Sequence, residues 1–358
     1  TDASNAAIQV LKEGEVQGSD VVAHSAGILD IKTNILPNAD ALFLTAIDPY
    51  GHELWRWTFP VNKLNQANEV LSPLSNKVTS TETENELTVK ANKRTFIFSK
   101  KDGQLKGVSV DNRKISFANG PRFIGARRAD RSLDQFYNHD DEKAKEKDRT
   151  YSEFPDAAVF TKLDVKEDGG NLVVTANYKL GNLDKAQWTI NPSGELALDY
   201  TYNFSGVVDL MGIRFDYPED QVISKRWLGA GPYRVWQNRI HGTQYDVWEN
   251  DYNDPIPGET FTYPEFKGYF GDVSWMNIQT KEGTISLTNE TPDAYIGVYQ
   301  PRDGRDRLLY TLPESGISVL NVIPPVRNKV NSTDLCGPSS QPKWVNGPQT
   351  GRVIFRFM

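Results

Sequence analysis

The chain has 358 residues, of which 38% are hydrophobic and 11% aromatic, and its formal net charge is −7. This composition is typical of a globular protein, and the length allows two or three domains, since single cores usually stop growing at about 250–300 residues. The negative charge argues against a nucleic-acid partner, and the sequence has no run of about 18 apolar residues that would predict a membrane span.

The first 60 residues show short β-type segments separated by turn residues. Expected strands include residues 27–32, 41–45 and 53–59. A polar stretch rich in Ser and Thr follows over residues 75–86, and it has the composition of a linker. The sequence therefore predicts a small β-sandwich and its linker over residues 1–78, with a domain boundary near residue 78.

From residue 79 to residue 358 the strand pattern continues without another break. Gly, Asn, Asp and Pro separate the segments as they do in hairpins, and no repeat is visible. The predicted fold class is therefore all-β, with one large antiparallel sandwich over residues 79–358. The clearest alternating segments are residues 87–91, 95–98, 172–178, 187–190, 196–202, 284–287 and 351–357.

One segment carries the most specific pattern. Residues 227–239 read Trp-Leu-Gly-Ala-Gly-Pro-Tyr-Arg-Val-Trp-Gln-Asn-Arg. This resembles the Leu-Gly-x-Gly-Pro-x-x-x-aromatic-x-x-Arg signature in the last domain of large glycoside hydrolase family 2 β-galactosidases. We call Gly231–Arg239 the signature segment.

Other motifs of that terminal domain follow the same order along the chain. Residues 96–105 are similar to its opening hairpin, residues 120–130 to its Arg-Ala segment, and residues 211–215 to the strand before the signature. Residues 263–268 and 272–275 are similar to two later motifs. The chain departs from the family pattern at Arg234, Asn238 and Ser274, where the family usually has Glu, Asp and Arg.

The resemblance implies an immunoglobulin-like β-sandwich, complete or incomplete, over residues 1–78. It implies a β-supersandwich of the galactose mutarotase-like superfamily over residues 79–358. In family 2 enzymes the two catalytic glutamates lie on a (β/α)₈ barrel, and this chain has neither the β/α alternation nor the length for one. We therefore expect no hydrolase activity from the chain alone. The Asn-Glu pairs at residues 85–86 and 289–290 are interpreted as surface polar residues.

The candidate sugar-binding residues lie in and after the signature segment. Aromatic rings that stack on sugars, among short polar groups, are typical of saccharide recognition. In the alternative interpretation, Arg239 and Glu265 form a buried structural pair, and the aromatic residues pack within the long loop without contacting a sugar. Trp275 is expected in the core. The carbohydrate-binding candidates are Trp236, Arg239, Tyr263, Glu265, Trp248, Arg234 and Asn238.

Metal and cofactor sites have little support in the sequence. The four histidines are scattered and Cys336 is the only cysteine, so no zinc spacing and no internal disulfide is expected. Asp251, Asn253 and Asp254 offer oxygen ligands suited to Ca²⁺ or Na⁺, although such groups are common in plain loops. We expect no cofactor.

The main hypothesis is a non-catalytic, carbohydrate-binding accessory region of a β-galactosidase-like enzyme. Its partners would be an oligosaccharide, galactose-containing or not, the catalytic barrel and, in a homodimer, a second copy; no nucleic acid or membrane is expected. A purely structural module is the alternative, and a mutarotase-like epimerase using His241 is a third reading. Residues 1–7 show no signal-peptide pattern, whereas the resemblance favours a periplasmic or secreted protein.

Overall fold

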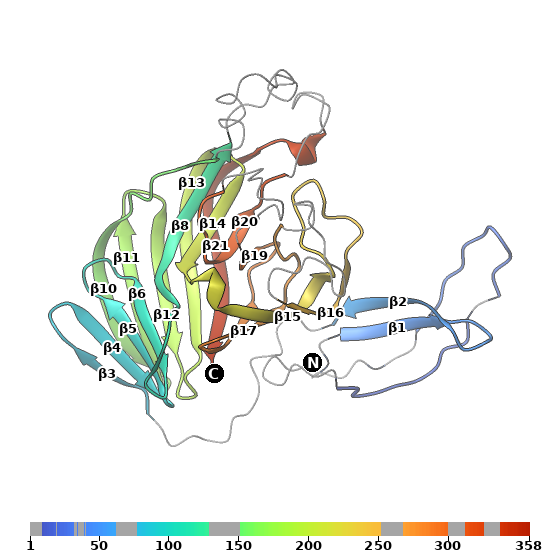
Figure 1. Cartoon of the computed structure of the whole chain (residues 1–358), viewed down its shortest axis with the longest axis horizontal. Coiled ribbons are helices and arrows are strands. Elements are labelled where there is room, and N and C mark those ends of the chain that lie inside the picture. Colours follow the sequence, from blue (N-terminus) through green and yellow to red (C-terminus); the bar gives the residue numbers. More distant parts are fainter. Residues whose placement is uncertain are drawn as a thin grey trace. The chain divides into compact units, whose positions relative to one another are not determined.

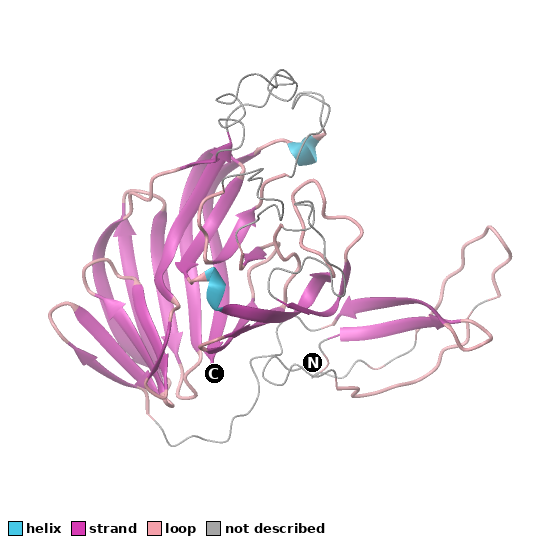
Figure 2. Ribbon diagram, viewed as in Figure 1, coloured by secondary structure: helices cyan, strands magenta, loops and turns pink. Residues whose placement is uncertain are grey.

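The computed structural model describes most of the chain: residues 9–18, 20–31, 34, 39, 41–61, 77–128, 151–251, 268–299, 312–325 and 337–358. Its contacts divide the chain into two units, Thr1–Glu69 and Val70–Met358. Almost all regular structure is β-strand (Figure 2). The helices in the described ranges are two short 3₁₀ turns, Glu219–Gln221 and Pro338–Ser340, and no helix there could span a membrane.

In the described part of the first unit, strands β1 (Ala41–Ile47) and β2 (Glu53–Pro60) form a β-hairpin (Figure 1). Its turn is organised by Asp48, whose carboxylate accepts hydrogen bonds of 2.8 Å from the backbone N–H groups of Tyr50 and His52. The strand expected over residues 27–32 is not formed over 27–31. The immunoglobulin-like sandwich for residues 1–78 therefore stays a prediction.

The second unit is a sandwich of two antiparallel sheets. The nine-stranded sheet has the order β10 (Val159–Asp168), β11 (Asn171–Lys179), β12 (Leu183–Ile190), β13 (Leu196–Val208), β21 (Lys343–Phe357), β18 (Gly283–Asn289), β17 (Trp275–Thr280), β15 (Val222–Gly231) and β16 (Gln244–Asp251). The ten-stranded sheet has the order β19 (Tyr295–Gly297), β20 (Ile317–Val322), β14 (Leu210–Asp216), β8 (Ala118–Arg128), β6 (Leu105–Val110), β5 (Arg94–Ser99), β4 (Glu86–Ala91) and β3 (Thr79–Glu82), with β7 (Arg113–Ile115) on β6 and β9 (Tyr151–Glu153) on β8.

The main core lies between these sheets and is rich in aromatic rings. Phe98 on β5 packs against Trp188 on β12 with ring centroids 6.0 Å apart. Phe117 contacts Phe215 at 4.7 Å and Phe355 of β21 at 4.9 Å. Each buried side chain of this kind contributes roughly 1.5–3 kcal/mol by leaving water, so rings from distant parts of the sequence hold the two sheets together.

The strand predictions for the second unit are confirmed. Along β11, Leu172, Val174 and Ala176 are buried while the residues between them are partly exposed, as alternation requires when one face is in the core. Tight turns join the strands at Gly103 and Gly194, which have φ of +71° and +84°; glycine adopts such angles without steric cost. The chain thus has the large antiparallel sandwich that the sequence predicts.

Candidate functional site

The signature segment begins where β15 ends, at a tight backbone approach. A Cβ atom on Gly231 would lie 2.4 Å from Cδ1 of the Trp248 indole, which is closer than real side chains allow, so the position requires glycine. Trp248 is half-buried, packs against the main core and donates from Nε1 to the Gln244 carbonyl oxygen at 3.1 Å. The glycine of the motif therefore provides room for this ring.

The middle of the signature segment is anchored on the second core, which covers the outer face of the ten-stranded sheet. Val235 and Tyr269 exchange two backbone hydrogen bonds of 2.7 and 2.8 Å. Trp236 has no exposed surface, and its ring lies edge-on to that of Tyr269 at 5.9 Å. The other buried members of this core are Ile124, Ala126, Tyr151, Leu210, Leu312, Leu320 and Ile323.

The burial of Trp236 bears on the two interpretations of this residue, sugar contact and packing. A ring that stacks on a sugar needs an exposed face, and Trp236 offers none in this structure. Its placement favours packing over sugar contact. Burial also raises the pKa of the neighbouring Tyr269 hydroxyl, which therefore stays protonated. Trp275, expected in the core, is fully buried.

Arg234 is buried as well, beside aromatic rings. Only 1% of its surface is exposed, and its guanidinium carbon lies 5.1 Å from the Tyr299 ring centre and 5.9 Å from that of Phe270. The ammonium of Lys225, also buried, lies 4.7 Å from the Tyr299 ring centre and donates to the Asp251 carbonyl oxygen. The Tyr299 ring thus contacts two cations, and each cation–π contact offsets part of the cost of burying that positive charge.

The last part of the signature segment is tied to two further segments of the chain. The Gln237 backbone N–H donates to the Pro324 carbonyl oxygen at 3.0 Å, and its side chain donates to the Gln341 carbonyl oxygen at 2.8 Å. Asn238 donates from Nδ2 to Ser340 Oγ at 3.4 Å. Hydrogen bonds from separate parts of the sequence therefore fix the loop in one conformation.

Arg239 ends the segment and is exposed. Its backbone N–H donates to the Trp236 carbonyl oxygen at 2.8 Å. The ion pair of Arg239 with Glu265 stays a prediction, because Glu265 lies outside the described residues. The candidates Tyr263, Glu265, Asn253 and Asp254 lie outside the described residues.

The histidine and carboxylate groups give no metal-like arrangement in the described part of the chain, where no three such residues come together. Asp251 is exposed. The dipeptide Asn289-Glu290 is part of a turn: Asn289 donates to the Val273 carbonyl oxygen at 3.2 Å, and Glu290 pairs with Arg352 at 3.0 Å. Structural contacts therefore occupy the side chains of this Asn-Glu pair.

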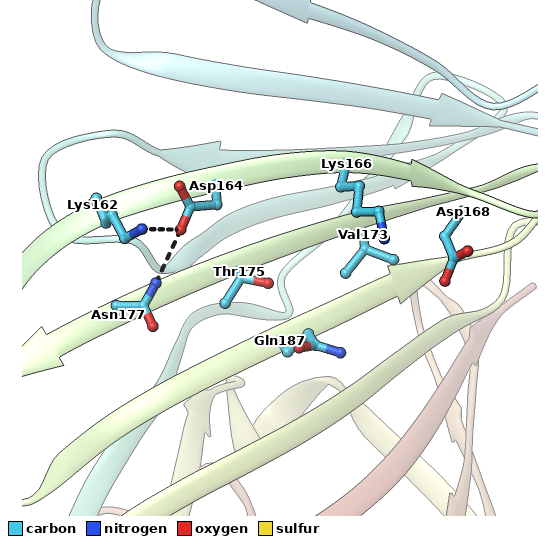
Figure 3. A pocket seen from close by; sticks show the side chains of 8 residues that line it. All are labelled: Lys162, Asp164, Lys166, Asp168, Val173, Thr175, Asn177 and Gln187. Atoms are coloured by element: carbon cyan, nitrogen blue, oxygen red, sulfur yellow. Dashed lines mark hydrogen bonds and ion pairs between the residues drawn. The ribbon is translucent and has the colours of Figure 1, made fainter.

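A surface depression of about 400 Å³ lies elsewhere, on the outer face of β10, β11 and β12 (Figure 3). It is polar and shallow, and neither histidine nor glutamate lines it. No motif in the sequence marks this face, although the charge alternation of β10 is visible there. Its lining residues are Lys162, Asp164, Lys166, Asp168, Val173, Thr175, Asn177 and Gln187.

Comparison with known proteins gives one family match. Residues 90–324 match the family model described as beta galactosidase small chain. No curated protein matches the chain significantly.

Solved structures of low sequence identity are also similar. Galactose 1-epimerase from Lactobacillus acidophilus NCFM has a TM-score of 0.41 and 10% identity over 79% of this chain and 99% of its own. A putative aldose 1-epimerase from Escherichia coli K12 has a TM-score of 0.34 and 12% identity over 78% of this chain and 99% of its own.

Proposed function

The chain belongs to the beta-galactosidase small chain family, and on that premise we propose that it is a non-catalytic accessory region of a β-galactosidase-like glycoside hydrolase. In this role it forms a wall of the substrate cleft and contacts the oligosaccharide. Binding energy from such a wall assists catalysis when it positions the sugar for the carboxylates of the barrel.

The observation that carries the proposal is the construction of the signature segment. Its buried half, with Trp236 and Arg234, is fixed on the sandwich, while its end, Arg239, reaches the surface. A binding residue is useful when packing and hydrogen bonds hold its supporting shell in place. The guanidinium offers a planar set of donors that suits vicinal hydroxyl groups or a carboxylate.

We propose separate roles for the candidate residues, supported by their burial. Trp236 and Arg234 act as the support, and Asn238 fixes the loop. Contact with the ligand falls to Arg239 and to Trp248, whose ring is partly exposed. Tyr263 and Glu265 stay in the proposal on the strength of the sequence alone.

The test is glycan binding by the whole 358-residue chain. We expect binding of galactose-terminated or plant-type oligosaccharides on an array, confirmed by calorimetry, and loss of that binding in Arg239→Ala. Arg113→Ala is the matched control, because Arg113 is an exposed arginine on β7. Binding that survives Arg239→Ala, or is lost equally in Arg113→Ala, would contradict the assignment to Arg239.

A second candidate function is a purely structural module, and the burial of Trp236 and Arg234 favours it. In that case the chain binds no glycan but still supports the activity of a β-galactosidase-like barrel supplied with it. Arg239→Ala would then leave both properties unchanged. The epimerase reading gains no support from the described residues, since His241 is exposed and the depression on β10–β12 lacks a His–Glu pair. The proposed role involves no cofactor.

A further inference from the structure

Strand β10 forms one edge of the nine-stranded sheet. Within the described ranges, β11 is the strand that pairs with it, along a regular register from Lys162–Asn177 to Asp168–Asn171. The side chains of β10 are mostly exposed. A regular edge strand offers a row of backbone donors and acceptors to another strand, so the backbone geometry for pairing is present.

The charges of β10 follow a pattern that is complementary to itself. Lys162, Asp164, Lys166 and Asp168 alternate in sign along the outer face (Figure 3). When two such strands run antiparallel about Val165, Lys162 of one copy lies opposite Asp168 of the other. Asp164 likewise lies opposite Lys166. Two-fold symmetry forms each of these pairs twice.

We propose that β10 is a homodimer interface, in which two copies of this chain pair antiparallel edge to edge about Val165 and join their nine-stranded sheets. Opposite charges directly across an antiparallel pair are stabilising, and like charges there are destabilising. Val165 lies at the two-fold axis, where 36% of its surface is exposed, and it meets its own symmetry mate.

The same charges oppose other arrangements. Moving the centre of pairing to Asp164 places Asp164 opposite itself and Lys162 opposite Lys166. Moving it to Lys166 places Lys166 opposite itself and Asp164 opposite Asp168. A shift of a single residue turns the outer face of one strand to the inner face of the other. Pairing about Leu163 or about Glu167 brings two opposite-charge pairs together, whereas pairing about Val165 brings four. The pattern therefore disfavours the registers centred on Asp164 or Lys166 by repulsion and gives the most attraction about Val165.

Two of the four charged side chains, Lys162 and Asp164, already make contacts on the outer face. Lys162 Nζ lies 2.7 Å from an Asp164 carboxylate oxygen, and Asn177 Nδ2 donates to that oxygen at 3.3 Å. The opposite face of the neighbouring strands is core, with Val174, Ala176 and Trp188 fully buried. These contacts restrict Lys162 and Asp164 before pairing, which lessens the side-chain entropy that these two residues lose on association.

One strand pair per copy is a small contact compared with a standard interface of about 800 Å² per partner. We therefore expect weak association, with a dissociation constant in roughly the micromolar range. Because the charge pairs are exposed, the dimer should weaken as salt is raised.

The test is sedimentation velocity of the full chain over a range of micromolar concentrations. Lys166→Asp places Asp164 opposite an aspartate twice and is expected to weaken dimerisation roughly 10–30-fold. Adding Asp164→Lys to this variant exchanges the two charges and restores complementarity, so dimerisation should return. Circular dichroism and thermal melts verify that each variant is folded.

A mixing experiment makes the test independent of any single variant. Lys166→Asp and Asp164→Lys each repel themselves but complement each other, so an equimolar mixture should form heterodimers where neither variant alone dimerises. A wild-type chain that stays monomeric at all concentrations would overturn the proposal. So would a dimer that is indifferent to Lys166→Asp, or variants that fail to rescue each other.

Discussion

Replacing Trp236 by alanine is expected to destabilise the second unit strongly, whatever it does to ligand binding. The side chain is fully buried in the second core, and truncating a buried tryptophan to alanine typically costs about 3–5 kcal/mol because contacts are lost and a cavity remains. The edge-on contact with Tyr269 accounts for about 0.5–1.5 kcal/mol of such an effect beyond area alone. For a unit of this size, the midpoint of thermal unfolding should fall on the order of 10 °C.

The assay is urea unfolding of the full chain followed by tryptophan fluorescence and circular dichroism, with thermal melts alongside. The control is Trp344→Ala, since Trp344 lies on β21 with 71% of its surface exposed, and exposed substitutions usually change stability by no more than about 0.5 kcal/mol. The packing argument is refuted if Trp236→Ala costs less than about 1 kcal/mol while abolishing glycan binding. That result would mean that the indole is a sugar platform and not a support.

Two further predictions concern a close approach and a buried hydroxyl. Gly231→Ala should lower the free energy of unfolding, measured in urea, by about 1–3 kcal/mol, because the added methyl group overpacks against Trp248. The control Gly337→Ala should be nearly neutral, because Gly337 has open space around it. Equal effects of the two substitutions would contradict the steric reasoning. Burial raises the pKa of Tyr200 to about 12, above the value of about 10 in an unfolded chain. The protonated Tyr200 hydroxyl therefore contributes its full stabilisation below about pH 10, and this contribution is lost as the pH rises toward about 12. Tyr200→Phe should lessen the fall in the free energy of unfolding over that interval. An unchanged dependence of the free energy of unfolding on pH in this variant would contradict the prediction.

The all-β fold could be predicted because its strands carry local signals. Leu172, Val174 and Ala176 alternate with polar residues, and turn residues mark the ends of such segments. The pairing order could not be predicted in the same way. β13 lies beside β21 although more than a hundred residues separate them, and alternation contains no information about which distant strand is the neighbour.

The motif indicates which segment to consider as the candidate site, but it does not show which of its residues contact a ligand and which pack in a core. An aromatic residue in a loop-rich segment has the same sequence signal whether it stacks on a ligand or fills a core, and the structure places Trp236 in the core. Arg234, which departs from the family pattern, lies over the ring of Tyr299, a residue too far away in sequence to be identified as its neighbour. The strand expected over residues 27–32 rested on an apolar run alone, without a visible pairing partner.

The central position of β21 has a consequence for synthesis in the cell. This strand joins β13 on one side to β18 on the other, so the two halves of the nine-stranded sheet cannot be united until the ribosome has made residues 343–357. At about 5–20 residues per second, the interval after β13 is on the order of ten seconds. During that interval β13 has an unpaired edge, and β18 adds a second once residues 283–289 have been made. The protein should therefore depend on chaperones during synthesis more than its final stability would suggest.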